Sequence, residues 1–218
     1  MRIYIDEAGR GPLAWPLYVG LILPLKKFSK SWFKDSKQIN HKQRELLFQK
    51  IKKLESDWKL LYSIGISTHK EIDKRWLTKA TNMAIKRWLK KLSFWPRNST
   101  GEEYKLYPSL HLPTGQAGSG WQRQLIIDWN NDFWLSKDLK IAVKTIIHGD
   151  DLVKEISMAS IIAKVSRDQH MEKLHRKYPQ YGFDKHKWYG TRFHYAMIQE
   201  YWICEIHRKL FLKNIKIK

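Results

Sequence analysis

The chain has a single cysteine, Cys204, among its 218 residues. One cysteine excludes an intrachain disulfide framework and a zinc site built on several cysteines. Long apolar runs are also absent, because no stretch reaches the roughly 20 residues that a membrane-spanning helix needs. The first residues enter an apolar strand pattern without the hydrophobic core of a signal peptide. We therefore expect a cytoplasmic protein without membrane association.

Acidic residues are few compared with basic ones. The chain has 21 Asp and Glu against 41 Lys and Arg, which gives a net charge of +20 and a sequence pI near 9.9. A strongly positive field favours a polyanionic partner such as nucleic acid, although charge alone does not distinguish nucleic acid from an anionic membrane surface. No Ser-His-Asp arrangement and no internal repeat is evident. The length suits one domain, or one domain with a small appendage.

Hydrophobic periodicity predicts a mixture of strands and helices. Strands are expected over residues 3–5 and 17–23, as a hairpin at the centre of a sheet, and over 58–66, 125–128 and 141–147. Helices are expected over 40–54, with Asn40 as its cap, and over 77–92, 155–177 and 194–206. Small residues in the first half of the 155–177 helix would allow it to pack closely on the sheet.

Between residues 95 and 124 the periodicity lapses, and three prolines and four glycines interrupt a polar stretch. A segment of this length without secondary structure is uncommon inside a compact domain. We interpret it as a surface-loop insertion. The lysine-rich end of the chain, after residue 208, is expected to be attracted to phosphates.

The sequence Asp6-Glu7-Ala8-Gly9-Arg10-Gly11-Pro12 places two carboxylates beside a glycine-rich loop, directly after an apolar run. Successive side chains of a strand point to opposite faces, so the two acids converge only if the strand ends or bends there, which the glycines and the proline permit. Mg²⁺ prefers carboxylate and phosphate oxygens. The alternative is a solvated acidic turn after an edge strand.

Two further acids follow predicted strands. Asp128 ends the strand over 125–128, and Asp150 follows Gly149 shortly before a long helix, with Asp151 as its nearest rival. Carboxylates gathered in one place raise one another's pKa and are normally held by cations. Two Mg²⁺ ions bound by such carboxylates can activate a water and stabilise the leaving oxygen in phosphodiester hydrolysis. The pattern therefore predicts a two-metal nuclease.

Two other segments have the composition of nucleic-acid contacts. The polar triplet Asp35-Ser36-Lys37 is a candidate phosphate contact, with an ordinary capped loop as its alternative. Tyr189 lies in a segment of lysines and glycine, where an aromatic ring can stack on a sugar or base while lysines contact phosphates. A turn whose aromatic ring fills the edge of the core is the alternative there.

Together with EISMASIIAKVSRD at 155–168, YPQYGF at 178–183 and IHR at 206–208, these motifs resemble the bacterial type 2 ribonuclease H family, ribonuclease HII. The similarity is collinear over nearly the whole chain except 95–124. It implies an α/β ribonuclease H-like fold with a mixed central β-sheet flanked by helices and a C-terminal helical extension. Residues 1–193 would form the catalytic domain, and 194–218 a helix and basic tail.

The resemblance implies a monomeric endonuclease that depends on Mg²⁺ or Mn²⁺ in a two-metal site. Its substrates would be RNA/DNA hybrids, in which it hydrolyses the RNA strand, and duplex DNA with embedded ribonucleotides. Its products would carry 3′-hydroxyl and 5′-phosphate ends. A related two-metal nuclease with another substrate preference is a more distant alternative.

The resemblance also implies roles for individual residues. The metal-binding acids would be Asp6, Glu7, Asp128 and Asp150. The substrate-binding residues would be Gly9, Arg10 and Gly11, which sense the ribose 2′-hydroxyl, Ser36 and Lys37, which contact phosphate, and Tyr189, which stacks on the sugar at the RNA–DNA junction. Arg167 and Asp168 match a further motif, and we interpret them as a structural ion pair.

Trp15, Trp129 and Trp188 stand where the family has glycine. Each flanks a site residue, and each is expected to crowd the site or strain the core by ~1–3 kcal/mol. If they are genuine, a catalytically weakened nucleic-acid-binding homologue is the alternative function. Our hypothesis is that the gene uses UGA as a glycine codon, which would also explain the eleven tryptophans of the chain, with Trp76 as a fourth case.

Overall fold

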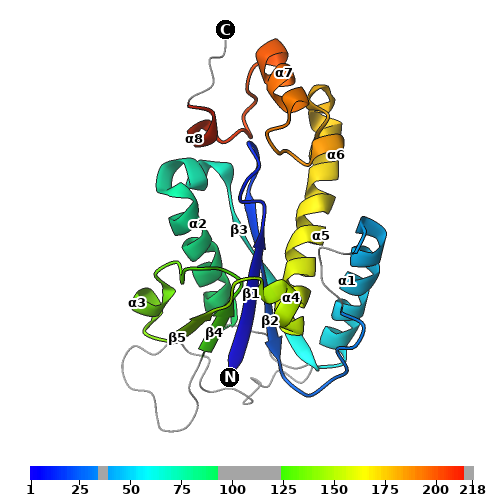
Figure 1. Ribbon diagram of the computed structural model, residues 1–218, viewed down its shortest axis with the longest axis vertical. Helices are drawn as coiled ribbons and strands as arrows, with labels where there is room; N and C mark the ends of the chain where they lie inside the picture. Colours follow the sequence, from blue (N-terminus) through cyan, green and yellow to red (C-terminus); the bar gives the residue numbers. More distant parts are fainter. Residues whose placement is uncertain (34–38, 93–123, 214–218) are drawn as a thin grey trace, which may run out of the picture.

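The computed structural model describes residues 1–33, 39–92 and 124–213. A five-stranded sheet in the order β3-β2-β1-β4-β5 lies at its centre (Figure 1). The strands are β1 Arg2–Ala8, β2 Leu17–Pro24, β3 Leu60–Ser67, β4 Gln124–Ile127 and β5 Ala142–Thr145. β1, β2 and β3 pair antiparallel, whereas β4 pairs parallel with β1 and β5 parallel with β4. The mixed sheet with a central hairpin, expected from the sequence, is confirmed.

Helices cover both faces of this sheet. The long ones are α1 His41–Ser56, α2 His69–Leu92 and α5 Lys154–Lys177, and the short ones are α3 Leu135–Leu139, α4 Gly149–Leu152, η2 Pro179–Tyr181, α6 Phe183–His186, α7 Arg192–Tyr201 and α8 Lys209–Leu212. Because side chains alternate along β1, Ile3 and Ile5 pack in the core on the α2 side. Tyr4 packs with residues of α1 and α5 on the other side. Figure 1 shows α2 on one side of the strands and α1 and α5 on the other.

A glycine in β2 sets the distance between α5 and the sheet. Gly20 is the β2 partner of Asp6. A Cβ atom at Gly20 would collide with the backbone carbonyl of Ala159 in α5. Gly20 and Ala159 therefore allow α5 to lie directly on β2, at the position that pairs with Asp6 of β1.

The predicted helix over 40–54 is confirmed as α1. Asn40 caps it: its Oδ1 accepts from the Gln43 amide, and the Gln43 side chain accepts from the Asn40 amide, both at 2.9 Å. The predicted helix over 155–177 is confirmed as α5. The strand expected over 58–66 begins two residues later, because Trp58 lies in a turn at φ 54°.

Two predicted elements end earlier than expected. The strand over 141–147 is shorter, because β5 covers only Ala142–Thr145. The helix predicted over 194–206 is wrong in its second half. It ends at Tyr201, because Trp202 takes φ 66° and ψ −176°, and the chain then turns so that His207 pairs with Ala14. The expected loop over 95–124 falls almost wholly outside the described residues.

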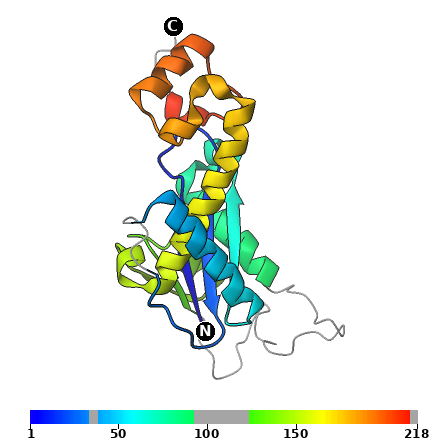
Figure 2. The ribbon, with the colours of Figure 1, turned by 90° about the vertical axis from the view of Figure 1, so that its right-hand side faces the viewer.

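The C-terminal segment forms a third core at the far end of α5. Residues of η2, α6, α7 and α8 enclose it, and Leu13 and Ala14 from the β1–β2 loop are part of it. Figure 2 shows these short helices gathered at one end of the molecule, next to the loop that follows β1. Trp188 is fully buried in this cluster.

Several tryptophans have backbone angles that suit glycine. Those with positive φ are Trp15, Trp58, Trp76, Trp134, Trp188 and Trp202. Trp76 has φ 64° and ψ 159° and interrupts α2, so that this helix consists of two pieces. The region occupied by Trp76 and Trp202 is essentially restricted to glycine, and each side chain held there costs of order 1–3 kcal/mol.

We expect Trp76→Gly and Trp202→Gly to stabilise the chain, each by ~1–2 kcal/mol, because glycine relieves the backbone strain. Both side chains are mostly exposed, at 66% and 59%, so little packing is lost. Urea unfolding measures the change. Trp32, also exposed but not among the positive-φ residues, is the matched control, and Trp32→Gly should not stabilise. Lower stability of Trp76→Gly than of the unsubstituted chain would contradict this account.

Candidate active site

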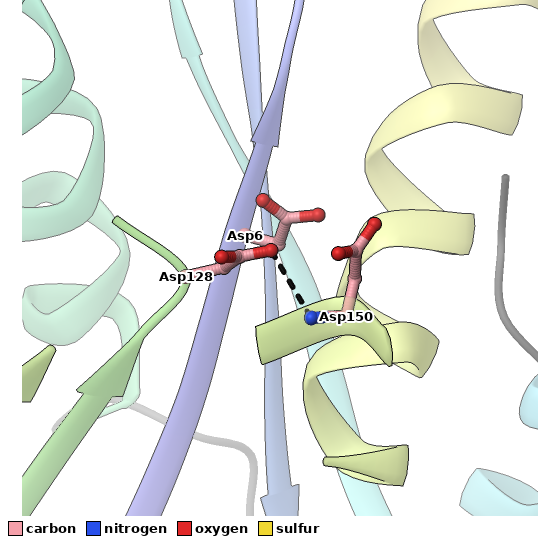
Figure 3. A group of neighbouring side chains, drawn as sticks. All are labelled: Asp6, Asp128 and Asp150. Atoms are coloured by element: carbon pink, nitrogen blue, oxygen red, sulfur yellow. Dashed lines mark hydrogen bonds between the residues drawn. The ribbon is translucent and has the colours of Figure 1, made fainter. Parts of the chain in front are cut away.

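Three aspartates from three different elements meet beside the central strand β1, where β4 ends. Asp6 belongs to β1, Asp128 directly follows β4, and Asp150 belongs to α4. Each offers a carboxylate oxygen, and these oxygens lie within 4.8 Å of one another. Figure 3 shows the three side chains converging on one point. The parallel pairing of β1 and β4 brings Asp6 and Asp128 together, as expected from acids that follow strands.

Backbone amides fix the orientation of Asp128. Its carboxylate oxygens accept from the amides of Gly149, at 2.9 Å, and Asp150, at 3.1 Å. A Cβ atom at Gly149 would lie 2.6 Å from Cδ1 of Ile156, so a larger residue there would have to displace the end of that side chain. The start of α4 is therefore tied to the end of β4, and Asp150 is carried into the cluster. Asp151, the rival in the sequence, is exposed.

The environment of the cluster favours protonated carboxyl groups. Burial raises the pKa of Asp6 to about 7, with further upward contributions from Asp128 and Asp150, while a hydrogen bond from Ser160 and the charge of Lys164 act in the opposite direction. Burial likewise raises the pKa of Asp128. A divalent cation would remove this repulsion, and a set of carboxylate oxygens is the donor set that Mg²⁺ and Mn²⁺ prefer. The three aspartates therefore fit such a metal.

Glu7 lies near this group but is held differently. The expectation that the strand ends at the acid pair is wrong: β1 continues to Ala8, which still pairs with Tyr18 of β2. Asp6 and Glu7 thus leave the strand on opposite faces. Glu7 Oε1 lies 3.7 Å from Nε of Arg10, and burial together with the charge of Asp6 raises the pKa of Glu7 well above its usual range.

A cleft of about 530 Å³ connects the acids with the predicted substrate residues. Every predicted site residue in the described part of the chain lines it: Asp6, Glu7, Gly9, Arg10, Gly11, Asp128, Asp150 and Tyr189. Ser36 and Lys37 lie outside the described residues. The ring of Tyr189 lies against the glycine loop, since a Cβ atom at Gly11 would be 3.2 Å from its Cε1. With 45% of its surface exposed, this ring is open to a ligand.

Helix α5 contributes residues that the sequence did not reveal as part of the site. Lys164 Nζ lies 3.9 Å from Oδ2 of Asp150, and Ser160 acts on Asp6 through a hydrogen bond. Arg167 lines the same cleft and forms the expected ion pair with Asp168, at 2.7 Å. The spacing of 160, 164 and 167 places these three residues on one helix face, which is the signal that could have identified them.

The backbone of Trp129 differs from those of Trp15 and Trp188. It is not among the residues with positive φ, so its backbone does not require glycine. Its ring lines the cleft, and the guanidinium carbon of Arg10 lies 4.2 Å from the ring centre. Trp129 therefore holds the Arg10 side chain by a cation–π contact.

Comparison with known proteins agrees with this geometry. The family model described as Ribonuclease HII matches residues 3–100 and 129–214. The Ribonuclease HII of Caldicellulosiruptor saccharolyticus is 36% identical over 211 residues, which cover 97% of this chain and 86% of that protein. The Ribonuclease HII of Bordetella avium is 36% identical over 207 residues, which cover 95% and 86%.

Solved structures of related proteins have the same fold. The ribonuclease H2 of Pyrococcus horikoshii OT3 matches with a TM-score of 0.64 and 25% identity, over 95% of this chain and 92% of that one. A chain in the PCNA:RNase HII complex from Archaeoglobus fulgidus matches with a TM-score of 0.69 and 20% identity, over 100% and 97%. With its acidic cluster, its glycine loop and the match of the family model, the chain belongs to the ribonuclease HII family.

Proposed function

We propose that this chain is an endonuclease that hydrolyses the RNA strand of RNA/DNA hybrids and cuts duplex DNA at embedded ribonucleotides. The products would carry 3′-hydroxyl and 5′-phosphate ends. The observation that supports this most directly is the convergence of three aspartates in a cleft that the glycine loop and Tyr189 also line.

Asp6, Asp128 and Asp150 would hold Mg²⁺ or Mn²⁺, with Glu7 as the fourth acid of a two-metal site. When bound, such ions supply an activated water and stabilise the charge of the leaving oxygen. The chain itself keeps the ligands in place. The amides of Gly149 and Asp150 fix the Asp128 carboxylate, and Lys164 balances part of the negative charge.

The other lining residues would select the substrate. The loop Gly9-Arg10-Gly11 would contact the ribose 2′-hydroxyl, the group that distinguishes RNA from DNA. Tyr189 would stack on the sugar or base beside the cut, and Ser36 and Lys37 would contact a phosphate. The net charge of +20 would attract the duplex over a longer range.

The site of action we propose is the cytoplasm. Among the helices that the structure describes, none combines the length and the apolar character required to cross a membrane.

A catalytically weakened nucleic-acid-binding homologue is the second candidate. It is favoured by the two bulky residues near the cleft with strained backbones, Trp15 at φ 85° and Trp188 at φ 72°. Such a protein would keep the basic surface and bind nucleic acid without cutting it.

The activity is tested with Mg²⁺ and a DNA duplex that contains one ribonucleotide. We expect cutting at the ribonucleotide and none in the matched all-DNA duplex. Asp6→Asn should lower the rate on the order of 1,000-fold, because it removes a metal ligand worth several kcal/mol of transition-state stabilisation. Asp151→Asn, which alters the exposed neighbour of Asp150, is the control and should cut normally.

Other outcomes separate the alternatives. Tight, salt-sensitive binding without cutting would support the weakened homologue. Equal cutting of the all-DNA duplex would support a nuclease with another preference. An Asp6→Asn variant as active as the unsubstituted chain would remove the metal role of Asp6.

A second test uses the pH dependence of stability without metal. The pKa of Asp6 is about 7 in the folded chain, above the ordinary value of about 3.9 expected in the unfolded chain. The folded state therefore binds the extra proton, and this contribution to stability is lost as the pH rises from about 4 through 7. With a chelator present, urea unfolding should show a smaller loss of stability over this range for Asp6→Asn than for the unsubstituted chain. Equal losses would contradict the assignment.

A further inference from the structure

Arg208, in the motif 206–208, is a buried cation whose hydrogen bonds to described residues all go to backbone carbonyls. It is 0% exposed. Its Nε donates to the Trp15 carbonyl at 2.7 Å, Nη2 to Gly9 at 2.6 Å, and Nη1 to Arg10 at 2.8 Å and Pro12 at 3.0 Å. No carboxylate within the described ranges forms an ion pair with it. Burial lowers the pKa of Arg208 to about 9, so it remains charged at neutral pH.

These contacts determine which way the loop peptides face. In a trans peptide the C=O of one residue and the N–H of the next point in opposite directions, and the described residues contain no cis peptide. Because the Gly9 and Arg10 carbonyls point to Arg208, the N–H groups of Arg10 and Gly11 point away from it. Residues 9–11 line the cleft whereas Arg208 does not, so these two N–H groups face the cleft.

The two N–H groups are not part of the hydrogen-bond pattern of the described residues. Neither the Arg10 amide nor the Gly11 amide donates to an acceptor in the part of the chain that the structure describes. These two adjacent amides lie in a glycine-containing loop next to the acidic cluster. They can therefore donate hydrogen bonds to an oxygen atom of a ligand.

The segment around Arg208 is fastened to the same loop on both sides. Trp15 N donates to the Ile206 carbonyl, and Arg208 N donates to the Leu13 carbonyl, both at 2.8 Å. This pairing fixes the position of the guanidinium group relative to the loop. The loop is thus held by backbone and side chain of one C-terminal segment.

The same segment also supports Tyr189. His207 Nε2 lies 3.2 Å from Nε2 of His194, and His194 Nδ1 lies 3.0 Å from the Tyr189 carbonyl oxygen. Both histidines are buried. The position of Tyr189 therefore depends on His207, and that of the Arg10 and Gly11 amides depends on its neighbour Arg208.

We propose that Arg208 is a positioning residue for ribose recognition: it orients the loop so that the Arg10 and Gly11 N–H groups donate to the ribose 2′-hydroxyl. This inference rests on the proposed function. Arginine suits the role because its planar fork offers five donors, whereas lysine has three donors on a flexible stem and cannot reproduce the fork. A substitution by lysine therefore leaves loop carbonyls without a partner.

The test compares Arg208→Lys with the unsubstituted chain. We expect the variant to bind Mn²⁺ unchanged but to cut at a single ribonucleotide at least about 30-fold more slowly, the equivalent of roughly 2 kcal/mol. Without metal it should also lose its preference for a ribonucleotide-containing duplex over an all-DNA duplex. Arg44→Lys is the matched control, because Arg44 also donates to a backbone carbonyl, that of Ile39. This variant should retain the cutting rate and the preference for the ribonucleotide-containing duplex.

The outcomes separate this inference from the proposed function. If the unsubstituted chain does not cut, the proposed function fails. If it cuts, and folded Arg208→Lys cuts and discriminates equally well, only the role of Arg208 is overturned. If Arg208→Lys does not fold, the proposal is tested by NMR of the unsubstituted chain with glycine-selective ¹⁵N labelling. The Gly11 amide should shift more with the ribonucleotide duplex than with the all-DNA duplex, and equal shifts would overturn the proposal.

A second inference concerns the tryptophans and rests on the backbone alone. Six of the nine tryptophans in the described part of the chain have positive φ, whereas only Gly9 and Gly182 among the described glycines do. Tryptophan rarely adopts this conformation, and glycine adopts it without steric cost. Among the described residues, tryptophan therefore occupies half of the positions with positive φ, and the other half is shared by Phe133, Lys140, His148, Lys187 and the two glycines.

The packing around Trp188 agrees. Its ring faces Phe183 in a nearly parallel stack with the centroids 3.4 Å apart, closer than the 4.5–7 Å usual for aromatic pairs. Its Nε1 is buried and lacks a hydrogen-bond acceptor among the described residues. Both features fit a side chain that is too large for its place.

The geometry points to glycine in the native protein at positions 15, 58, 76, 134, 188 and 202, with UGA as the codon at each. This extends the hypothesis from the sequence to Trp58, Trp134 and Trp202, whereas the backbone at Trp129, which that hypothesis included, does not support it. Trp32 and Trp88 are outside the positive-φ set, and Trp88 is buried in the core, so the inference predicts UGG at these two codons.

The gene sequence and the intact mass of the native protein test this assignment. We expect UGA at the six codons, UGG at codons 32 and 88, and a mass lower than that of the written chain by at least six tryptophan-to-glycine differences. UGG at any of the six overturns the assignment for that position. UGA at codon 88, or a mass equal to that of the written chain, overturns the geometric rule as a whole.

Discussion

The gathering of three carboxylates beside the central strand β1 is the constraint on which the rest of the structure depends. Asp6 and Asp150 are almost fully buried, and like charges this close are stable only when protonated or bound to a cation. The surrounding structure maintains this costly arrangement. Parallel pairing of β1 and β4 brings two of the acids together, Gly20 admits α5 against the sheet, and amides at the start of α4 fix Asp128. Because the three carboxylates repel one another when ionised, their arrangement favours the binding of a divalent cation.

Around this acidic cluster, the cleft is completed by a loop that the other end of the chain holds. Residues 9–11 lie between the cleft and Arg208, whose donors all go to carbonyls of the 9–15 loop. His207 and His194 connect the same C-terminal segment to Tyr189. The acids that would hold metal come from the sheet and α4, whereas the groups that would contact the sugar depend on the C-terminal segment. Under the proposed function, the residues for chemistry and those for substrate recognition would therefore be held by different parts of the chain within one cleft.

Local signals in the sequence predicted the central hairpin, the Asn40 cap and the acids after strands, because periodicity and capping act over a few residues. Contacts between distant segments could not be predicted in this way. The position of the α5 residues in the site depends on the close approach of α5 to Gly20 in the sheet. The Glu7 side chain points to the face of β1 opposite to that of Asp6, because β1 is still paired with β2 at this residue. The last predicted helix ends early because of the backbone at Trp202, and its remaining apolar residues pack in the C-terminal core instead. The family resemblance provided residue roles that spacing alone did not.

The central claim is that Asp6, Asp128 and Asp150 form a divalent-cation site. The most direct measurement is the anomalous diffraction signal of Mn²⁺ in crystals of the chain. The account predicts a peak at coordinating distance from oxygens of all three aspartates, with the Asp128 carboxylate still held by the amides of Gly149 and Asp150. A peak elsewhere, or no peak at saturating Mn²⁺ while the three carboxylates keep their positions, would contradict it.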